Sequence, residues 1–231
     1  MLIVALGLAL LYIPKGELHL ALCDHHTHAR DIFFRYYTQV AEWFPYVVCI
    51  ALLLFSRIGD GIFASVCMIV SALTTQILKH LVNAPRPITW FAEHMPDVTL
   101  PMAENVQIHA WYSFPSGHTT SFFALAFVLC ILLTKNPRIP RFSKFLVQIL
   151  LFALAALGGY SRIYLCQHFA LDVFAGILVG IGITMLFYTV FCHFEDKKWY
   201  KYRLFSKKFG HIKKKQYLCT RFRKRSINEG V

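Results

Sequence analysis

The sequence predicts an all-α protein, a six-span transmembrane helical bundle, on two observations. Of its 231 residues, 57% are hydrophobic and only 16% are charged, whereas an ordinary soluble domain carries about 25% charged residues. The apolar residues also gather in six uncharged runs of 14 to 20 residues, and about 20 apolar residues in a helix cross the roughly 30 Å core of a bilayer. A chain this small cannot hide six such helices from water, which excludes a soluble globular core.

Each run has its own reason to be expected as a span. The third to sixth runs hold 16 to 20 residues, close to the length that a span needs. The second holds 14 residues and can be extended back through Val40 and Ala41. The first also holds 14 residues but has nothing before it, so we expect it to be tilted into a thin region or to start upstream of Met1. A cleaved signal peptide is the alternative for this run, although it lacks a basic n-region and a small-x-small cleavage site. In order, the runs are Met1–Pro14, Trp43–Ser56, Gly61–Leu78, Thr119–Thr134, Phe145–Ser161 and Val173–Cys192.

The basic residues of the loops predict the orientation of the bundle. Lys and Arg accumulate on the cytoplasmic side of membrane proteins. Of the 24 here, 18 lie in the second loop, the fourth loop and the C-terminal tail, against six on the opposite face. Both termini are therefore expected in the cytoplasm, with the first, third and fifth loops outside. The first loop, Lys15–Glu42, is expected to form a partly amphipathic outer helix.

The net charge of +12 belongs mostly to the C-terminal tail. Residues 195–231 hold 13 basic and 3 acidic residues, whereas residues 1–194 hold 11 basic and 9 acidic ones. We therefore expect two parts, a six-span domain over 1–194 and a basic cytoplasmic tail over 195–231. The tail begins beside the membrane and interleaves aromatic residues with Lys and Arg, which favours anionic lipid headgroups over nucleic acid as its partner.

The seven cysteines are odd in number, lie mostly inside the expected spans and include no CxxC pair. They are expected to act as small apolar residues, not as a metal site or a disulfide framework. Cys23 and Cys166 both fall on the expected outer face, where a disulfide bridge is chemically possible. Neither a metal nor a cofactor is expected.

Polar residues concentrate where four of the spans meet the expected outer face. The third span ends in KHLVNAPRP, the fourth opens with FPSGHTTS, and GGYSRIYLCQHFALD joins the fifth to the sixth. Ionisable groups near a bilayer are costly and usually functional. The set contains three cations, two histidines, a carboxylate and a Ser-Gly pair before a helix, which together suit a phosphate group. Its members are Lys79, Arg86, Ser116, Gly117, His118, Ser161, Arg162, His168 and Asp172.

Phosphate chemistry gives the cations and the Ser-Gly pair a common role. Positioned cations and backbone N–H donors stabilise the charge that spreads over the phosphoryl oxygens during transfer. Arg86 lies between two prolines, so its backbone is stiff. The helix that follows Ser116 and Gly117 offers its N-terminal N–H groups and dipole to an anion.

The two histidines suit the steps of bond making and bond breaking. His168 and Asp172 are four residues apart, on one face if the sixth helix begins near Gln167, so the carboxylate can orient the imidazole as a nucleophile. His118 can then protonate the leaving oxygen.

Each residue also has an ordinary structural interpretation when it is taken alone. Lys79 can be an interfacial lysine that reaches the headgroups, Ser116-Gly117 an ordinary helix start, and Asp172 a carboxylate at a helix N-terminus. His118 alone can be an interfacial polar residue. If all of these separate interpretations were correct, the polar residues would have gathered on one membrane face only by chance. We therefore expect one joint site.

These segments resemble the three signature motifs of the type 2 phosphatidic acid phosphatase superfamily: Lys-x6-Arg-Pro, Pro-Ser-Gly-His and Ser-Arg-x5-His-x3-Asp. All signature positions are filled, and residues 1–194 resemble the membrane-bound lipid phosphate phosphatase branch of that family. The matching residues are Lys79, Arg86, Pro87, Pro115, Ser116, Gly117, His118, Ser161, Arg162, His168 and Asp172.

The resemblance implies a metal-independent phosphohydrolase. In that family the residue at His168 attacks phosphorus and forms a phosphohistidine, assisted by the Asp at position 172. The His at position 118 protonates the departing group, and the remaining motif residues bind the phosphoryl oxygens. An all-helical core is also implied.

The substrate is expected to be a lipid phosphate or diphosphate, because an amphiphile whose tail stays in the leaflet reaches the end of a spanning helix most easily. Membrane members of the family act on undecaprenyl diphosphate, phosphatidylglycerol phosphate, phosphatidate and lipid A phosphates. Aromatic residues of the third loop, Ile88–Phe114, either contact that lipid or anchor the loop at the interface.

The expected location is a bacterial inner membrane with the site on the periplasmic side, and a relative in the eukaryotic endoplasmic reticulum is left open. The alternative function is a non-hydrolytic membrane transporter or lipid-binding protein on the same fold. A transporter should line a path through its core with charges, whereas here the charges stop at the helix ends. The sequence makes no prediction of oligomeric state.

Overall fold

The computed structural model of the protein describes residues 12–23, 26–41, 43–103, 106–107 and 109–203, together with Gly7 and Leu10. Over these residues the secondary structure is helical and contains no β-strand, which confirms the all-α prediction. The helices are α2 (Lys15–Cys23), α3 (His28–Gln39), α4 (Trp43–Ser56), α5 (Ile58–Val82), α6 (Pro87–His94), α7 (Gly117–Lys135), α8 (Arg141–Tyr164) and α9 (Ala170–Phe191), with a 3-10 turn at Cys192–Phe194.

Four helical segments of the described chain are long and apolar enough to cross a membrane: Ile58–His94, Gly117–Lys135, Arg141–Tyr164 and Ala170–Phe194. They contain the expected third to sixth spans, so the chain is a multi-pass membrane protein. Helix α4 coincides with the expected second span, but its 14 residues rise only about 21 Å. The first expected span, Met1–Pro14, lies almost wholly outside the described residues. The six-span count therefore stays a prediction.

The single outer helix expected over Lys15–Glu42 is wrong, because this segment forms two helices, α2 and α3. Helix α3 has its own start: Thr27 is in an extended conformation, and its hydroxyl accepts a hydrogen bond from Arg30 N at 3.4 Å. A Thr at this position satisfies one of the N–H groups that a helix start leaves unpaired. Helix α3 then packs against α8, where Tyr37 OH donates to Leu154 O at 2.8 Å.

The core of the bundle forms around α7, which packs against α5, α8 and α9. Two glycines let the α9 backbone approach α7 closely. A Cβ at Gly176 would lie 2.6 Å from Ser116 O, and one at Gly180 would lie 2.6 Å from Thr120 O. Small residues four apart allow this kind of close helix contact in membranes.

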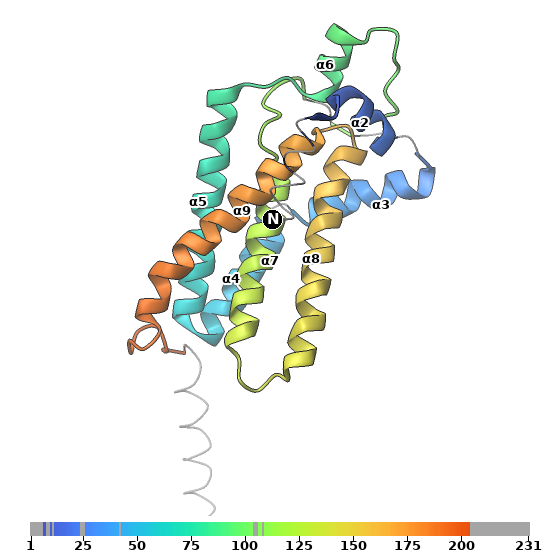
Figure 1. Ribbon diagram of the computed structural model, residues 1–231. Helices are drawn as coiled ribbons and strands as arrows, with labels where there is room; N and C mark the ends of the chain where they lie inside the picture. Colours follow the sequence, from blue (N-terminus) through green and yellow to red (C-terminus); the bar gives the residue numbers. More distant parts are fainter. Residues whose placement is uncertain are drawn as a thin grey trace, which may run out of the picture.

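The ends of the helices sort into two groups (Figure 1). Helices α5 and α8 end, and α7 and α9 begin, at one end of the bundle, which also carries α2, α3 and α6. We call this the motif end, because the three motifs meet there, as the alternation of spans predicts. The side of the membrane that it faces stays a prediction.

The opposite end holds the described start of the C-terminal tail. Tyr200 is buried, its hydroxyl donates to Asp60 Oδ1 at 3.0 Å, and its carbonyl accepts from Gly59 N at 3.1 Å. Residues 195–203 therefore return to the start of α5. Residues 204–231, which hold most of the expected basic tail, lie outside the described residues, so the division at 194 and 195 stays a prediction.

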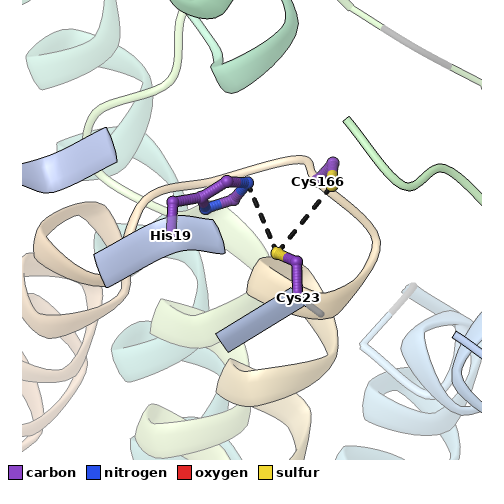
Figure 2. Close-up of side chains that lie close together, drawn as sticks. All are labelled: His19, Cys23 and Cys166. Carbon is purple, nitrogen blue, oxygen red and sulfur yellow. Dashed lines mark hydrogen bonds between the residues drawn. The ribbon is translucent and has the colours of Figure 1, made fainter. Parts of the chain in front are cut away.

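Two of the cysteines meet at the motif end (Figure 2). Cys23 Sγ, from α2, lies 3.9 Å from Cys166 Sγ, from the connection between α8 and α9. Both are free thiols and both are buried. The sequence placed them on one face, where a disulfide bridge was a possible alternative to their expected role as small apolar residues, and here they are close but not bonded.

Candidate active site

The predicted site residues converge at the motif end from four chain segments. Lys79 lies in the last turn of α5, and Arg86 directly precedes α6. Ser116, Gly117 and His118 open α7, Ser161 and Arg162 lie in the last turn of α8, and His168 and Asp172 flank the start of α9. Asn83 caps the end of α5: it is in the left-handed conformation with φ 45° and donates its N–H to Lys79 O at 2.9 Å. Asn tolerates this conformation, and it turns the chain from Lys79 toward Arg86.

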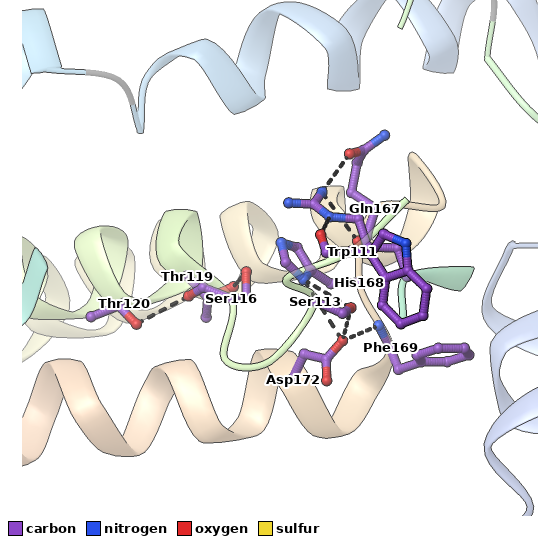
Figure 3. A network of polar contacts seen from close by, with 10 residues as sticks. Trp111, Ser113, Ser116, Thr119, Thr120, Gln167, His168, Phe169 and Asp172 are labelled. Carbon is purple, nitrogen blue, oxygen red and sulfur yellow. Dashed lines mark hydrogen bonds and ion pairs between the residues drawn. The ribbon is translucent and has the colours of Figure 1, made fainter. Parts of the chain in front are cut away.

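The carboxylate of Asp172 joins three partners (Figure 3). Its Oδ2 accepts from Phe169 N at 2.9 Å and from Ser113 Oγ at 2.5 Å, and it lies 3.7 Å from His168 Nδ1. Helix α9 begins at Ala170, not near Gln167 as the sequence reasoning assumed. Asp172 therefore meets His168 because it caps the helix start, and not because the two residues share a helical face.

Ser113 lies between the histidine and the carboxylate, and the sequence analysis missed it. Its Oγ lies 3.5 Å from His168 Nδ1 as well as 2.5 Å from Asp172 Oδ2. A hydroxyl donates one hydrogen bond and accepts others, so Ser113 can accept from Nδ1–H while it donates to the carboxylate. This arrangement favours the tautomer that leaves the Nε2 lone pair free. Its position in the sequence could have pointed to it, since Ser113 stands two residues before Pro115 of the second motif.

His168 is almost completely buried, with 1% of its surface exposed. Burial lowers the pKa of its imidazole to about 4, against the opposing effect of the Asp172 carboxylate. The ring is therefore neutral at neutral pH. Its backbone N–H donates to Arg162 O at 3.1 Å, which folds the connection back over the end of α8.

The guanidinium of Arg86 is held by two other segments. Its Nε donates to Trp111 O at 3.0 Å, and Nη1 donates to the side chain of Gln167 at 2.8 Å. Gln167 in turn donates through Nε2 to Gln107 O at 3.2 Å. The third loop and the connection before His168 thus fix the orientation of Arg86, and Gln167 is a second residue that the sequence analysis missed.

Arg162 is buried and only partly bonded. Its Nη1 donates to Thr38 Oγ1 at 2.7 Å, whereas its Nε is buried and has no hydrogen-bond partner. Buried donors are nearly always paired in folded proteins. The charges of Lys79 and Arg86 interact with that of Arg162, and the carboxylate of Asp172 offsets those of Lys79 and Arg86. The cluster has an excess of positive charge and a buried donor that an anion could satisfy.

The start of α7 lies beside these cations. A Cβ at Gly117 would lie 3.9 Å from Lys79 Nζ, so the ammonium group is next to the first turn. The backbone N–H of Ser116 is not available to a ligand in this arrangement, because it donates to Asp172 O at 2.9 Å. The Ser116 hydroxyl instead accepts from Thr119 Oγ1 at 2.9 Å and keeps its own proton to donate. His118, in the first turn, interacts electrostatically with Arg162, His168 and Lys79.

Ser161 is at the site but faces its own helix. Its hydroxyl donates to Gly158 O at 2.6 Å and its surface is fully buried. A hydroxyl whose proton is engaged offers only lone pairs, which repel phosphate oxygens. Its role as a phosphate ligand stays a prediction and would require this bond to break.

A cavity of about 410 Å³ opens beside Lys79 and Arg86 and is lined on the other side by the third loop, including His109, Trp111 and Tyr112. The two aromatic side chains are exposed by 45% and 42%. Burial, together with the positive charges of Arg86 and Lys79, lowers the pKa of His109. The cavity therefore joins the cation cluster to an exposed aromatic rim.

Comparison with known proteins gives relatives that are phosphatases. The chain is 31% identical to dolichyldiphosphatase 1 of Dictyostelium discoideum over 61% of this chain and 56% of that protein. It is 26% identical to undecaprenyl-diphosphatase BcrC of Bacillus subtilis over 71% of this chain and 77% of that protein. The chain spans only about half the length of the first curated relatives that it matches.

The fold has a similar counterpart among solved structures. The crystal structure of Aquifex aeolicus LpxE superposes with a TM-score of 0.62 at 25% identity, over 77% of this chain and 96% of that one. The sequence profile described as the PAP2 superfamily matches residues 60–195, which contain every predicted site residue. The chain therefore belongs to the PAP2 superfamily, that of the type 2 phosphatidic acid phosphatases.

Proposed function

We propose that the protein is an integral membrane phosphatase that hydrolyses a lipid phosphate or diphosphate through a phosphohistidine at His168. In the first step Nε2 of His168 attacks phosphorus, an N–P bond forms, and the P–O bond to the leaving group breaks while His118 transfers a proton to the leaving oxygen. In the second step water attacks phosphorus, His118 accepts a proton from that water, the N–P bond breaks and inorganic phosphate leaves.

The other residues of the site hold the reacting groups. Asp172, through Ser113, keeps the imidazole oriented. Lys79, Arg86 and Arg162 bind the phosphoryl oxygens, with donors from the start of α7 at Ser116 and Gly117, and with Ser161 as a further predicted ligand. This chemistry needs no metal ion, since the cations supply the charge that stabilises the transition state.

The single observation that carries the proposal is the buried Nε of Arg162, which has no hydrogen-bond partner in a cluster of three cations. An isolated cation cluster of this kind is unfavourable, because like charges repel in a medium of low dielectric constant. A phosphoryl group would supply both the acceptor that Nε lacks and the negative charge that the cluster lacks.

The substrate class follows from the surroundings of the cluster and from the relatives. The cavity reaches an exposed aromatic rim at the motif end, where a lipid whose tail stays in the leaflet can present its headgroup. The names of two relatives refer to dolichyl diphosphate and undecaprenyl diphosphate. We therefore place a polyprenyl diphosphate first among the substrates, ahead of phosphatidylglycerol phosphate and lipid A phosphates.

We also propose that the motif end faces the periplasm of a bacterial inner membrane and that the termini are cytoplasmic. The excess of Lys and Arg in the loops of the opposite end and in the tail supports this orientation. The tail then lies where it can bind anionic headgroups.

The test is phosphate release by the purified full chain in lipid micelles, with undecaprenyl diphosphate, phosphatidylglycerol phosphate, phosphatidate and lipid A offered separately. We expect release from at least one lipid, and we expect His168→Ala to lower the rate by at least about 10³-fold. The exposed His193, at the other end of the bundle, gives the control variant His193→Ala, which should keep the wild-type rate.

Two outcomes would overturn the proposal. Wild-type turnover by a folded His168→Ala variant would exclude His168 as the nucleophile. Lipid binding by the wild-type chain without any phosphate release would instead favour a non-hydrolytic lipid-binding protein or transporter on this fold.

A further inference from the structure

A second cluster of reactive side chains lies at the motif end, outside the proposed phosphate site. His19 and Cys23 project from one face of α2, and Cys166 projects toward them from the connection between α8 and α9 (Figure 2). All three are buried, with 1%, 0% and 4% of their surfaces exposed. The two α2 residues are four apart and therefore share a helical face.

The distances within the cluster match those between ligands of one tetrahedral metal ion. Cys23 Sγ lies 3.4 Å from His19 Nε2 and 3.9 Å from Cys166 Sγ. With Zn–S bonds of about 2.3 Å and Zn–N bonds of about 2.0–2.1 Å, tetrahedral geometry places two sulfurs about 3.8 Å apart and sulfur and nitrogen about 3.6 Å apart. The third pair, His19 and Cys166, lies within 4.8 Å.

The ring of His19 is held in a fixed orientation within the cluster. Its Nδ1 is buried without a hydrogen-bond partner, and its ring is held in place by Phe91 and Phe169, at centroid distances of 5.8 and 5.1 Å. The packing against these rings fixes the imidazole with Nε2 toward Cys23 Sγ, at 3.4 Å. A metal bound at Nε2 would leave the proton on Nδ1.

We propose that His19, Cys23 and Cys166 bind one zinc ion that holds α2 to the connection between α8 and α9. Two thiolates and an imidazole are the donor types that Zn²⁺ prefers. Binding replaces two S–H bonds with two Zn–S bonds and releases two protons, without any electron transfer. The ion and two thiolates together carry no net charge, which suits a buried site.

Three protein ligands leave the fourth tetrahedral position to a water molecule. We assign the ion a structural role because its ligands are buried, join α2 to the connection between α8 and α9, and include no residue of the proposed phosphate site. Cys166 stands two residues before His168, so the ion would anchor the connection that carries the nucleophile. The backbone of Cys166 is in the left-handed region, with φ 51°, a conformation that costs energy for a residue other than Gly, Asn or Asp. A bond at its sulfur would help to hold that conformation. The proposal does not depend on phosphatase activity.

The experiment uses the full chain, expressed with zinc in the medium and purified in detergent with a reductant. We expect about one zinc ion per chain by elemental analysis, and loss of that zinc in Cys23→Ser and in Cys166→Ser. Cys67→Ser is the matched control, since Cys67 is also fully buried but belongs to a different cluster in α5. The Cys67→Ser variant should keep its zinc.

A second measurement does not depend on the variants folding. Cobalt added to the chelator-stripped wild-type chain should produce the near-ultraviolet thiolate-to-cobalt charge-transfer band, and zinc should then remove it. Restored zinc should also raise the melting temperature of the stripped protein.

The proposal is overturned if the wild-type chain holds no more zinc than Cys23→Ser and shows no cobalt band. Peptide mass spectrometry of protein purified without reductant provides the other refutation. A disulfide linking Cys23 to Cys166 in most of the chains would show that the two sulfurs bond to each other instead.

Discussion

Replacing Ser113 with Ala should slow phosphoryl transfer and leave substrate binding almost unchanged. The Ser113 hydroxyl lies 2.5 Å from Asp172 Oδ2 and 3.5 Å from His168 Nδ1, whereas the carboxylate and the imidazole are themselves 3.7 Å apart. Without the hydroxyl, no group between them would hold the proton on Nδ1. Ser113 is thus a positioning residue that acts through His168.

The size of the effect follows from the bond that is lost. A hydrogen bond to a charged group contributes about 1.5–3 kcal/mol, and each 1.36 kcal/mol in the barrier changes a rate about tenfold. If the whole loss falls on the transition state, kcat should fall about 10- to 150-fold. KM should stay within about twofold, because Ser113 does not touch the proposed phosphate ligands.

The assay is phosphate release from a lipid phosphate in micelles over a range of substrate concentrations. Ser65→Ala is the control, since its hydroxyl also donates within the protein, to Gly61 O at 2.8 Å, but lies in the first turns of α5 at the opposite end. The double variant with Asp172→Asn should be little slower than Asp172→Asn alone, because both changes break the same chain of bonds. A kcat for Ser113→Ala within twofold of wild type, or fully additive effects, would refute the reasoning.

Three further predictions concern the cations, the helix contact and the need for metal. Arg162→Lys keeps the charge but removes Nε–H, so kcat/KM in the phosphate-release assay should fall about 10- to 100-fold; an unchanged value would mean that Nε does not bind substrate. Gly176→Ala places a Cβ 2.6 Å from Ser116 O and should lower stability by about 1–3 kcal/mol in a thermal melt. The control Gly182→Ala should leave stability unchanged, because nothing lies within 4 Å of its Cβ. Equal melting temperatures for the two variants would contradict the close approach of α9 to α7. Turnover should persist during a short assay in excess EDTA and should be inhibited by vanadate, which mimics five-coordinate phosphorus. A strict requirement for added divalent metal would argue against a phosphohistidine mechanism that relies on the cations alone.

Much of the proposed site could be predicted from the sequence, because spans that alternate in direction must bring every second helix end to the same side. This rule alone placed Lys79, Arg162 and Asp172 together, and the described helices confirm that they share one end of the bundle. The family could also be predicted from the sequence, because its motifs are specific in residue type and spacing.

Contacts between segments far apart in the chain could not be predicted from the sequence. Ser113 lies 55 residues from His168, and Gln167 lies 81 residues from Arg86. No periodicity links such pairs, since their meeting depends on how loops fold over the helix ends. The hydrogen bond from Ser116 N to the carbonyl of Asp172, 56 residues along the chain, could not be predicted for the same reason.

The sequence by itself determined that this is a helical membrane protein with a cluster of cations at one end, because hydrophobicity, charge and motif spacing can be recognised without knowing how the helices pack. Only the tertiary structure decided how the side chains of that site are held. Ser113 between His168 and Asp172, the unpaired Nε of Arg162, and the meeting of His19 with Cys23 and Cys166 all depend on distances of a few ångströms between separate segments. Such distances are set by packing, above all by the close approach of α9 to α7 and by the folding of the connections over the motif end.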